Sequence, residues 1–118
     1  MSSRAITILL ACALTLSILA VSALPTATKH ALHTQGALHP WLHLIGFALL
    51  AFLFLSVTRS IPLRLVFLAA LLLFGYGTEA RESRKDGWPI EQKDVYTDGL
   101  GVLLGATLSF LPRRQHSP

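Results

Sequence analysis

All six acidic residues of this 118-residue chain lie in one stretch, residues 75–105. They are Glu79, Glu82, Asp86, Glu91, Asp94 and Asp98. In a chain this apolar, carboxylates are groups that can share a proton, pair with a histidine or hold a cationic ligand. The histidine best placed to join them is His43, near the start of an apolar block. We therefore take His43, Glu79, Asp94 and Asp98 as a candidate polar site.

Three kinds of chemistry fit this set of residues. It could be a polar binding pocket at one end of a helical bundle. It could support general acid–base catalysis by His43 with a carboxylate. The simplest alternative is structural, with His43 and Asp98 satisfying one another inside the bundle. The sequence contains no nucleophile beside a base and no phosphate-cradling loop, so it does not specify a reaction.

A metal site is not indicated by the spacing of potential ligands. No HExxH or CxxC motif is present, and Pro40 interrupts the helical register between His39 and His43. We therefore expect no metal and no cofactor. The single cysteine, Cys12, lies inside an apolar run and cannot form an internal disulfide.

Asp94, Asp98, Gly101 and Gly105 follow one another at i, i+4, i+7 and i+11, so on a helix they share one face. Small residues at this spacing allow two helix backbones to approach closely in lipid. We therefore expect Gly101 and Gly105 to pack against a neighbouring helix. That neighbour could belong to the same chain or to a partner protein.

The elements that must position these residues are long apolar blocks. Hydrophobic residues make up 53% of the chain and charged residues only 14%, gathered at block boundaries. This composition is typical of membrane proteins. It predicts an all-α integral membrane protein, an antiparallel bundle of four transmembrane helices forming a single domain over residues 1–118. The predicted spans are residues 5–24, 41–58, 61–77 and 95–111. The first could instead be a cleaved secretory signal, but its apolar run is long for one, so we expect a retained helix.

The basic excess of ten Lys and Arg over six acids does not indicate nucleic-acid binding, because no basic stripe is interleaved with exposed aromatics. In a membrane protein such charges set topology and contact anionic lipids. The segments predicted on the two sides of the membrane carry equal numbers of basic residues. On one side, however, the basic residues lie in short, uniformly basic segments: Arg4, Arg59, Arg64, Arg113 and Arg114. We therefore expect both termini in the cytoplasm.

Three segments resemble the VanZ-like membrane proteins: HPWLHLIGFALLAFLF, GYGTEA and KDVYTDGLGVLLG, within residues 39–105. Matched by position, His43, Glu79 and Asp94 take the places of the family's His, Glu and Asp. Asp98 stands where the family usually has Asn. Gly101 and Gly105 match the family's glycines.

Some positions depart from the family pattern. His39 and Pro40 replace an Asp-Lys pair, Leu44 replaces a Phe, and Glu82 replaces a Gln. An arginine that the family carries just before the Asp is absent here. These differences weaken any transfer of ligand specificity.

The resemblance implies a bacterial inner-membrane protein with four spans. The family's name-giving member is associated with resistance to the glycopeptide teicoplanin. The expected function is therefore to bind or act on a cell-envelope component, such as a cell-wall or lipid-linked precursor, within membrane lipids. The alternative is a non-catalytic subunit that forms a homo- or hetero-oligomer through its Gly-rich fourth helix.

Overall fold

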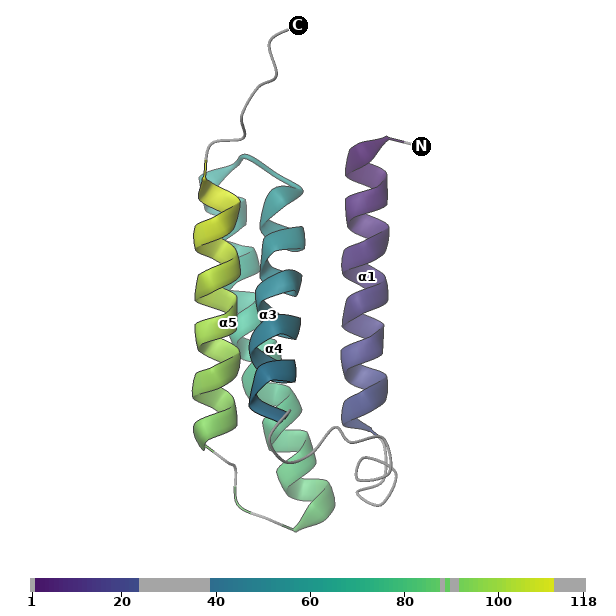
Figure 1. Cartoon of the computed structure of the whole chain (residues 1–118), viewed down its shortest axis with the longest axis vertical. Coiled ribbons are helices and arrows are strands. Elements are labelled where there is room, and N and C mark those ends of the chain that lie inside the picture. The colour runs from purple at the N-terminus through teal and green to yellow at the C-terminus, as the bar shows by residue number, and fades with distance from the viewer. Residues whose placement is uncertain (1, 24–38, 88, 90–91, 112–118) are drawn as a thin grey trace, which may run out of the picture.

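The computed structural model describes residues 2–23, 39–87, 89 and 92–111, and this part of the chain is helical with no strand. The helices are α1 (Ser3–Ser22), α3 (His39–Ser56), α4 (Ile61–Asp86) and α5 (Gln92–Phe110). Consecutive helices run antiparallel, so that α1 starts and α5 ends at the same end of the bundle (Figure 1). Over these described ranges, the prediction of an all-helical fold with four helices is confirmed.

Local sequence explains where several helices begin and end. The Ser2 hydroxyl accepts a hydrogen bond from the Ala5 amide at 3.1 Å and caps the start of α1. The Ser60 hydroxyl caps α4 in the same way, and Pro62 occupies the first turn, where its missing N–H costs nothing. Gly87, with φ 70°, ends α4 in the left-handed conformation that glycine adopts most easily.

The third helix extends beyond its predicted span. That span, residues 61–77, ends at Gly77, but α4 continues to Asp86. Residues 78–86 contain no glycine or proline, and their Glu, Ala, Arg and Lys residues favour helix. Glu79 is therefore inside α4 rather than at its end, which fixes the direction of its side chain.

Helices α3, α4 and α5 form the core, and α1 packs mainly on α3. The buried core side chains are Phe47, Leu50, Ala51 and Leu55 of α3, Leu71 of α4, and Val102 and Ala106 of α5. In α1 only Ala11 and Ser22 are buried. The three core helices are thus the elements that can hold a site rigidly.

The glycines of α5 lie against α3 of the same chain. A Cβ added to Gly105 would be 2.0 Å from the carbonyl oxygen of Ala48, and one added to Gly101 would be 2.6 Å from that of Leu44. Contacts this short are possible only for glycine. The Gly101 and Gly105 face is therefore already covered within the chain.

At one end of the bundle, Arg64 ties the start of α4 to its neighbours. Its Nε donates a hydrogen bond to the Thr58 carbonyl at 2.7 Å. Its guanidinium lies 4.6 Å from the centre of the Phe110 ring, a cation–π distance. This contact joins the α3–α4 turn to the last turn of α5, at the end where α1 begins.

The outside of the bundle is apolar, and two helices are long and apolar enough to cross a membrane. These are α1 and the Ile61–Arg84 part of α4. All four helices expose large apolar side chains. Residues Pro40–Ser56 of α3 are apolar but shorter, and α5 carries Lys93, Asp94 and Asp98. Length and composition therefore support two of the four predicted membrane spans.

Candidate functional site

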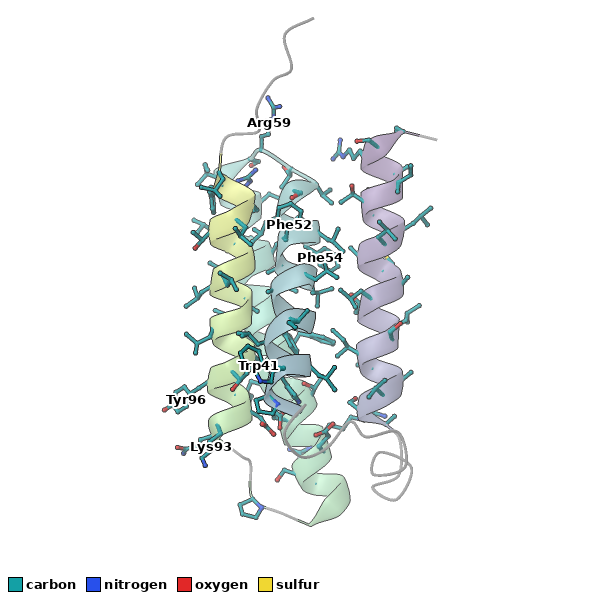
Figure 2. The ribbon with its side chains drawn as sticks, in the orientation of Figure 1. Trp41, Phe52, Phe54, Arg59, Lys93 and Tyr96 are labelled. Atoms are coloured by element: carbon teal, nitrogen blue, oxygen red, sulfur yellow. The ribbon has the colours of Figure 1, made fainter. Side chains whose placement is uncertain are left out.

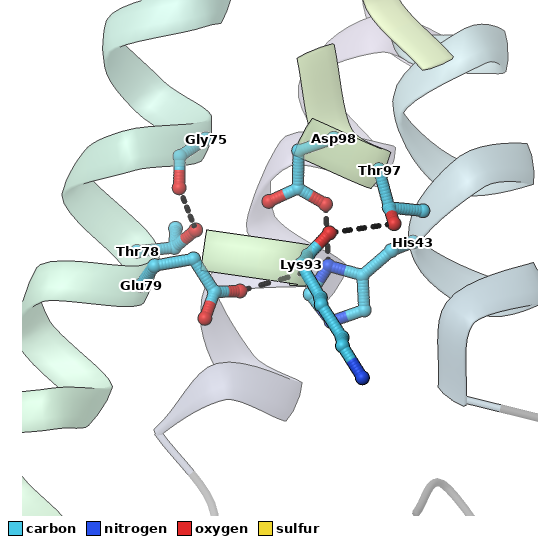
Figure 3. A network of polar contacts seen from close by, with 7 residues as sticks. All are labelled: His43, Gly75, Thr78, Glu79, Lys93, Thr97 and Asp98. Carbon is cyan, nitrogen blue, oxygen red and sulfur yellow. Dashed lines mark hydrogen bonds and ion pairs between the residues drawn. The ribbon is translucent and has the colours of Figure 1, made fainter. Parts of the chain in front are cut away.

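His43, Glu79 and Asp98 converge from three different helices (Figure 3). The His43 Nδ1–H donates a short hydrogen bond to Asp98 Oδ1. Glu79 Oε1 lies 3.6 Å from His43 Nδ1, within ion-pair distance but too far for a good hydrogen bond. One potential ligand atom from each residue lies within 4.8 Å of the other two. We call these three residues the His43–Glu79–Asp98 cluster.

Core packing positions the cluster. The His43 ring stacks on Phe47, one turn later on α3, with ring centroids 6.4 Å apart. Phe47 in turn contacts Phe74 of α4, at 5.9 Å between ring centroids. Gly75 lets α4 approach α5 closely, because a Cβ there would lie 3.2 Å from the Cβ of Asp98. The site thus rests on the hydrophobic core.

The cluster is buried and incompletely satisfied. The side chains of His43, Glu79 and Asp98 are 16%, 5% and 2% exposed. Glu79 Oε1 and Asp98 Oδ2 are buried without a hydrogen-bond partner among the described residues. A buried polar atom left unpaired costs about 1–3 kcal/mol, and more when it is charged. The arrangement therefore has spare acceptor capacity that the described part of the protein does not use.

The electrostatic surroundings are negative. Asp94 is buried one turn before Asp98, and its charge acts on both Glu79 and Asp98, as does that of the half-buried Glu82. In the described ranges, Glu79 and Asp98 form ion pairs with His43 and with no lysine or arginine. The exposed Lys93 side chain points away from the cluster (Figure 3). The site is therefore suited to a hydrogen-bond donor or a cation.

The hydroxyl groups beside the cluster are used elsewhere. Thr78 Oγ1 donates to the Gly75 carbonyl at 2.9 Å, and Thr97 Oγ1 donates to the Lys93 carbonyl at 2.7 Å (Figure 3). Neither threonine is held by His43 as a nucleophile would be. The geometry thus favours binding over nucleophilic catalysis.

Of the four residues proposed from the sequence, the structure brings three into the cluster. Asp94, the fourth, lies one turn before Asp98 on α5, and its charge acts on Glu79 and Asp98. Sequence reasoning did not single out Gly75 or Phe47 as supports of the site. The spacing of Gly75 and Glu79, four residues apart on one face of α4, is the signal that could have revealed the first.

A groove of about 500 Å³ runs between α4 and α5 and reaches the cluster. Its lining includes Leu71, Leu72 and Gly75 of α4 and Tyr96, Asp98 and Gly99 of α5. The groove is thus apolar apart from Asp98 and the Tyr96 hydroxyl. We call it the α4–α5 groove.

Exposed aromatic residues mark the level of the site. Trp41 of α3 and Tyr96 of α5 are 61% and 69% exposed and lie toward the same end of the bundle (Figure 2). Each precedes a cluster residue, His43 or Asp98, by two positions. At about 1.5 Å per helical residue, the cluster lies about 3 Å deeper than these aromatics along the helices. Trp and Tyr concentrate at membrane–water interfaces, so this pattern fits a site just below one interface.

Comparison of the chain with protein-family models, with curated proteins and with solved structures found no match. The resemblance to VanZ-like proteins therefore rests on the three segments quoted above. The functional argument rests on the cluster, the groove and the apolar exterior.

Proposed function

We propose that this chain is a small integral protein of a bacterial inner membrane, of VanZ-like type, that binds the polar head of a cell-envelope component. The binding site is the His43–Glu79–Asp98 cluster. The observation that carries the proposal is the pair of buried carboxylate oxygens, Glu79 Oε1 and Asp98 Oδ2, that lack a hydrogen-bond partner in the described structure. A buried polar atom without a partner lowers the stability of the protein. A bound ligand that pairs with these two oxygens explains why the protein has them.

The exterior supports a bundle in which all four helices cross the membrane. By length and composition, α1 and α4 can each cross a membrane. The acidic face of α5 turns inward, so that Asp94 and Asp98 are buried in the bundle rather than exposed to lipid. Intramembrane carboxylates are usual only in such inward positions. Arg59 lies at the end away from the site (Figure 2). The basic residues at that end lie in short, uniformly basic segments, so we place that end, where α1 begins and α5 ends, in the cytoplasm, and the site then faces outward.

The groove suggests that the ligand has a lipid part. An acyl or prenyl chain can lie in the apolar α4–α5 groove while its head reaches Asp98 at the groove wall. The depth of the cluster, just below Trp41 and Tyr96, matches the level of lipid head groups. A lipid-linked cell-wall precursor combines these two parts.

The alternative of a docking subunit loses its main support. It relied on the Gly101 and Gly105 face, which the fold places against α3. A partner would have to use another face of α5, and no described feature of that face specifies one.

The proposal is tested by expression in a teicoplanin-susceptible bacterium. The wild-type chain is expected to raise the minimal inhibitory concentration of teicoplanin. Glu79→Gln, at equal membrane abundance, should abolish the effect because it removes one of the two acceptor carboxylates. Glu82→Gln, one turn away on the same helix, is the matched control; it removes a nearby negative charge but leaves all three cluster residues in place, and should retain most of the effect. No change with the wild type, or full activity of Glu79→Gln, would refute the proposed function.

A further inference from the structure

The cluster has the donor set of a transition-metal site. His43 offers an imidazole nitrogen, and Glu79 and Asp98 each offer a carboxylate oxygen, all within 4.8 Å of one another. In a tetrahedral zinc site with bonds of about 2.0–2.2 Å, donor atoms lie about 3.4 Å apart. The distance from Glu79 Oε1 to His43 Nδ1, 3.6 Å, is already close to this value. Small side-chain adjustments would complete the geometry.

The two oxygens without partners point to a cation rather than to a neutral group. Both belong to side chains more than nine-tenths buried, and Figure 3 shows both side chains turned toward His43. A water molecule would pair with these oxygens singly, whereas one cation can be bound by both carboxyl groups and the imidazole together. Asp94 adds a further buried negative charge one turn away. A divalent cation would satisfy the oxygens and the charge together.

The nature of the donors narrows the choice of cation. Calcium takes six to eight oxygen ligands, and magnesium keeps an octahedral shell of oxygens and waters. One imidazole with two carboxylates suits zinc or a related transition metal, with one position left open as in catalytic zinc sites.

We propose that His43, Glu79 and Asp98 bind one divalent transition-metal ion, for which Zn²⁺ is the probe. This inference rests on the proposed function in that it uses the same site, with the metal's open position taking an oxygen of the ligand head. It replaces the sequence-based expectation of no metal. That expectation came from the absence of a short ligand motif, whereas these ligands come from three helices.

The test is a Zn²⁺ titration of the full-length protein, purified in detergent and stripped of metal with a chelator. A chromophoric chelator competing for Zn²⁺ gives affinity and stoichiometry. We expect one Zn²⁺ per chain. Changing a residue that only supports a metal ligand weakens metal binding by about 10–100-fold. Because Glu79→Gln and Asp98→Asn change the ligands themselves, each should weaken Zn²⁺ binding by at least about 100-fold. Glu82→Gln should change the affinity by far less.

Other results would overturn the metal site. Zn²⁺ bound equally well by wild type, Glu79→Gln and Asp98→Asn would show that histidines outside the cluster hold it, and absence of Zn²⁺ binding would be equally decisive. Circular dichroism reports whether each variant is folded. If Asp98→Asn does not fold, Glu79→Gln decides. A teicoplanin effect without Zn²⁺ binding would refute the metal site alone, and Zn²⁺ binding without that effect would refute the proposed function alone.

Discussion

Gly105→Ala tests the close contact between α3 and α5 on which the site is built. The added Cβ would lie 2.0 Å from the Ala48 carbonyl oxygen and 2.9 Å from both the Ala48 carbonyl carbon and the Ala51 Cβ. Two of these three atoms are backbone, so no rotamer change relieves the clash. Ordinary contact begins at 3.4 Å, and the helices must therefore separate by about 1.4 Å, the difference between 3.4 and 2.0 Å.

Such a shift loosens the core that the two helices share. A gap of about 0.5–1 Å already forfeits a quarter to a half of each dispersion contact. Leu50 and Val102, both fully buried, would lose contacts across this interface. Overpacking typically costs about 1–3 kcal/mol, and a backbone clash belongs at the upper end of that range. We expect Gly105→Ala to lower the free energy of unfolding by about 3 kcal/mol relative to its control.

The control is Gly46→Ala, because a Cβ at Gly46 meets nothing within 4 Å. It carries the same gain in helix propensity, about 1 kcal/mol in water, without the clash. Both variants and the wild type are unfolded by denaturant titration in detergent micelles, followed by circular dichroism. Equal stability of Gly105→Ala and Gly46→Ala would refute the close helix contact.

Three further predictions follow from the fold. Reporter fusions after Thr58 and after Gly87 should report opposite sides of the membrane, and the same location for both would contradict the crossing of α4. Leu50→Ala should lower the free energy of unfolding by about 2–5 kcal/mol because it leaves a cavity, whereas the exposed Leu100→Ala should change it by less than about 0.5 kcal/mol. Gly87→Ala should cost about 1 kcal/mol in the same unfolding assay because φ is 70° there, and an unchanged midpoint would count against that helix end.

The apolar blocks predicted the helices well because their composition leaves few other structures in a membrane-like chain. The third predicted span, residues 61–77, is shorter than α4 because the charged residues 81–86 are not part of an apolar block. Those residues are good helix formers, and only Gly87 stops them. Composition does not mark α5 as a membrane span, since Lys93, Asp94 and Asp98 lower its apolar character, although the fold buries the two acids.

The site was predicted in part, and the limit is physical. Periodicity places Asp94 and Asp98 on one face of α5, but it cannot show which of them meets His43. That choice depends on how α3 and α5 pack, which is set by Gly101 and Gly105 against the α3 backbone. Likewise, spacing within one helix cannot reveal a ligand set assembled from three helices. From the sequence alone, the same glycines could equally have packed against a helix of a partner protein.

The most direct test of the central claim, that the cluster is a ligand site rather than a structural support, is the unfolding free energy of Glu79→Met in chelator-containing detergent buffer. Methionine fills a similar volume without the buried oxygen that lacks a partner. A buried polar atom without a hydrogen-bond partner costs about 1–3 kcal/mol, and the substitution removes that cost while Asp98 still pairs with His43. The account predicts that Glu79→Met is at least as stable as the wild type, while Zn²⁺ binding and the teicoplanin effect are lost. A loss of stability of about 3 kcal/mol or more, as when a structural buried ion pair is broken, would contradict it.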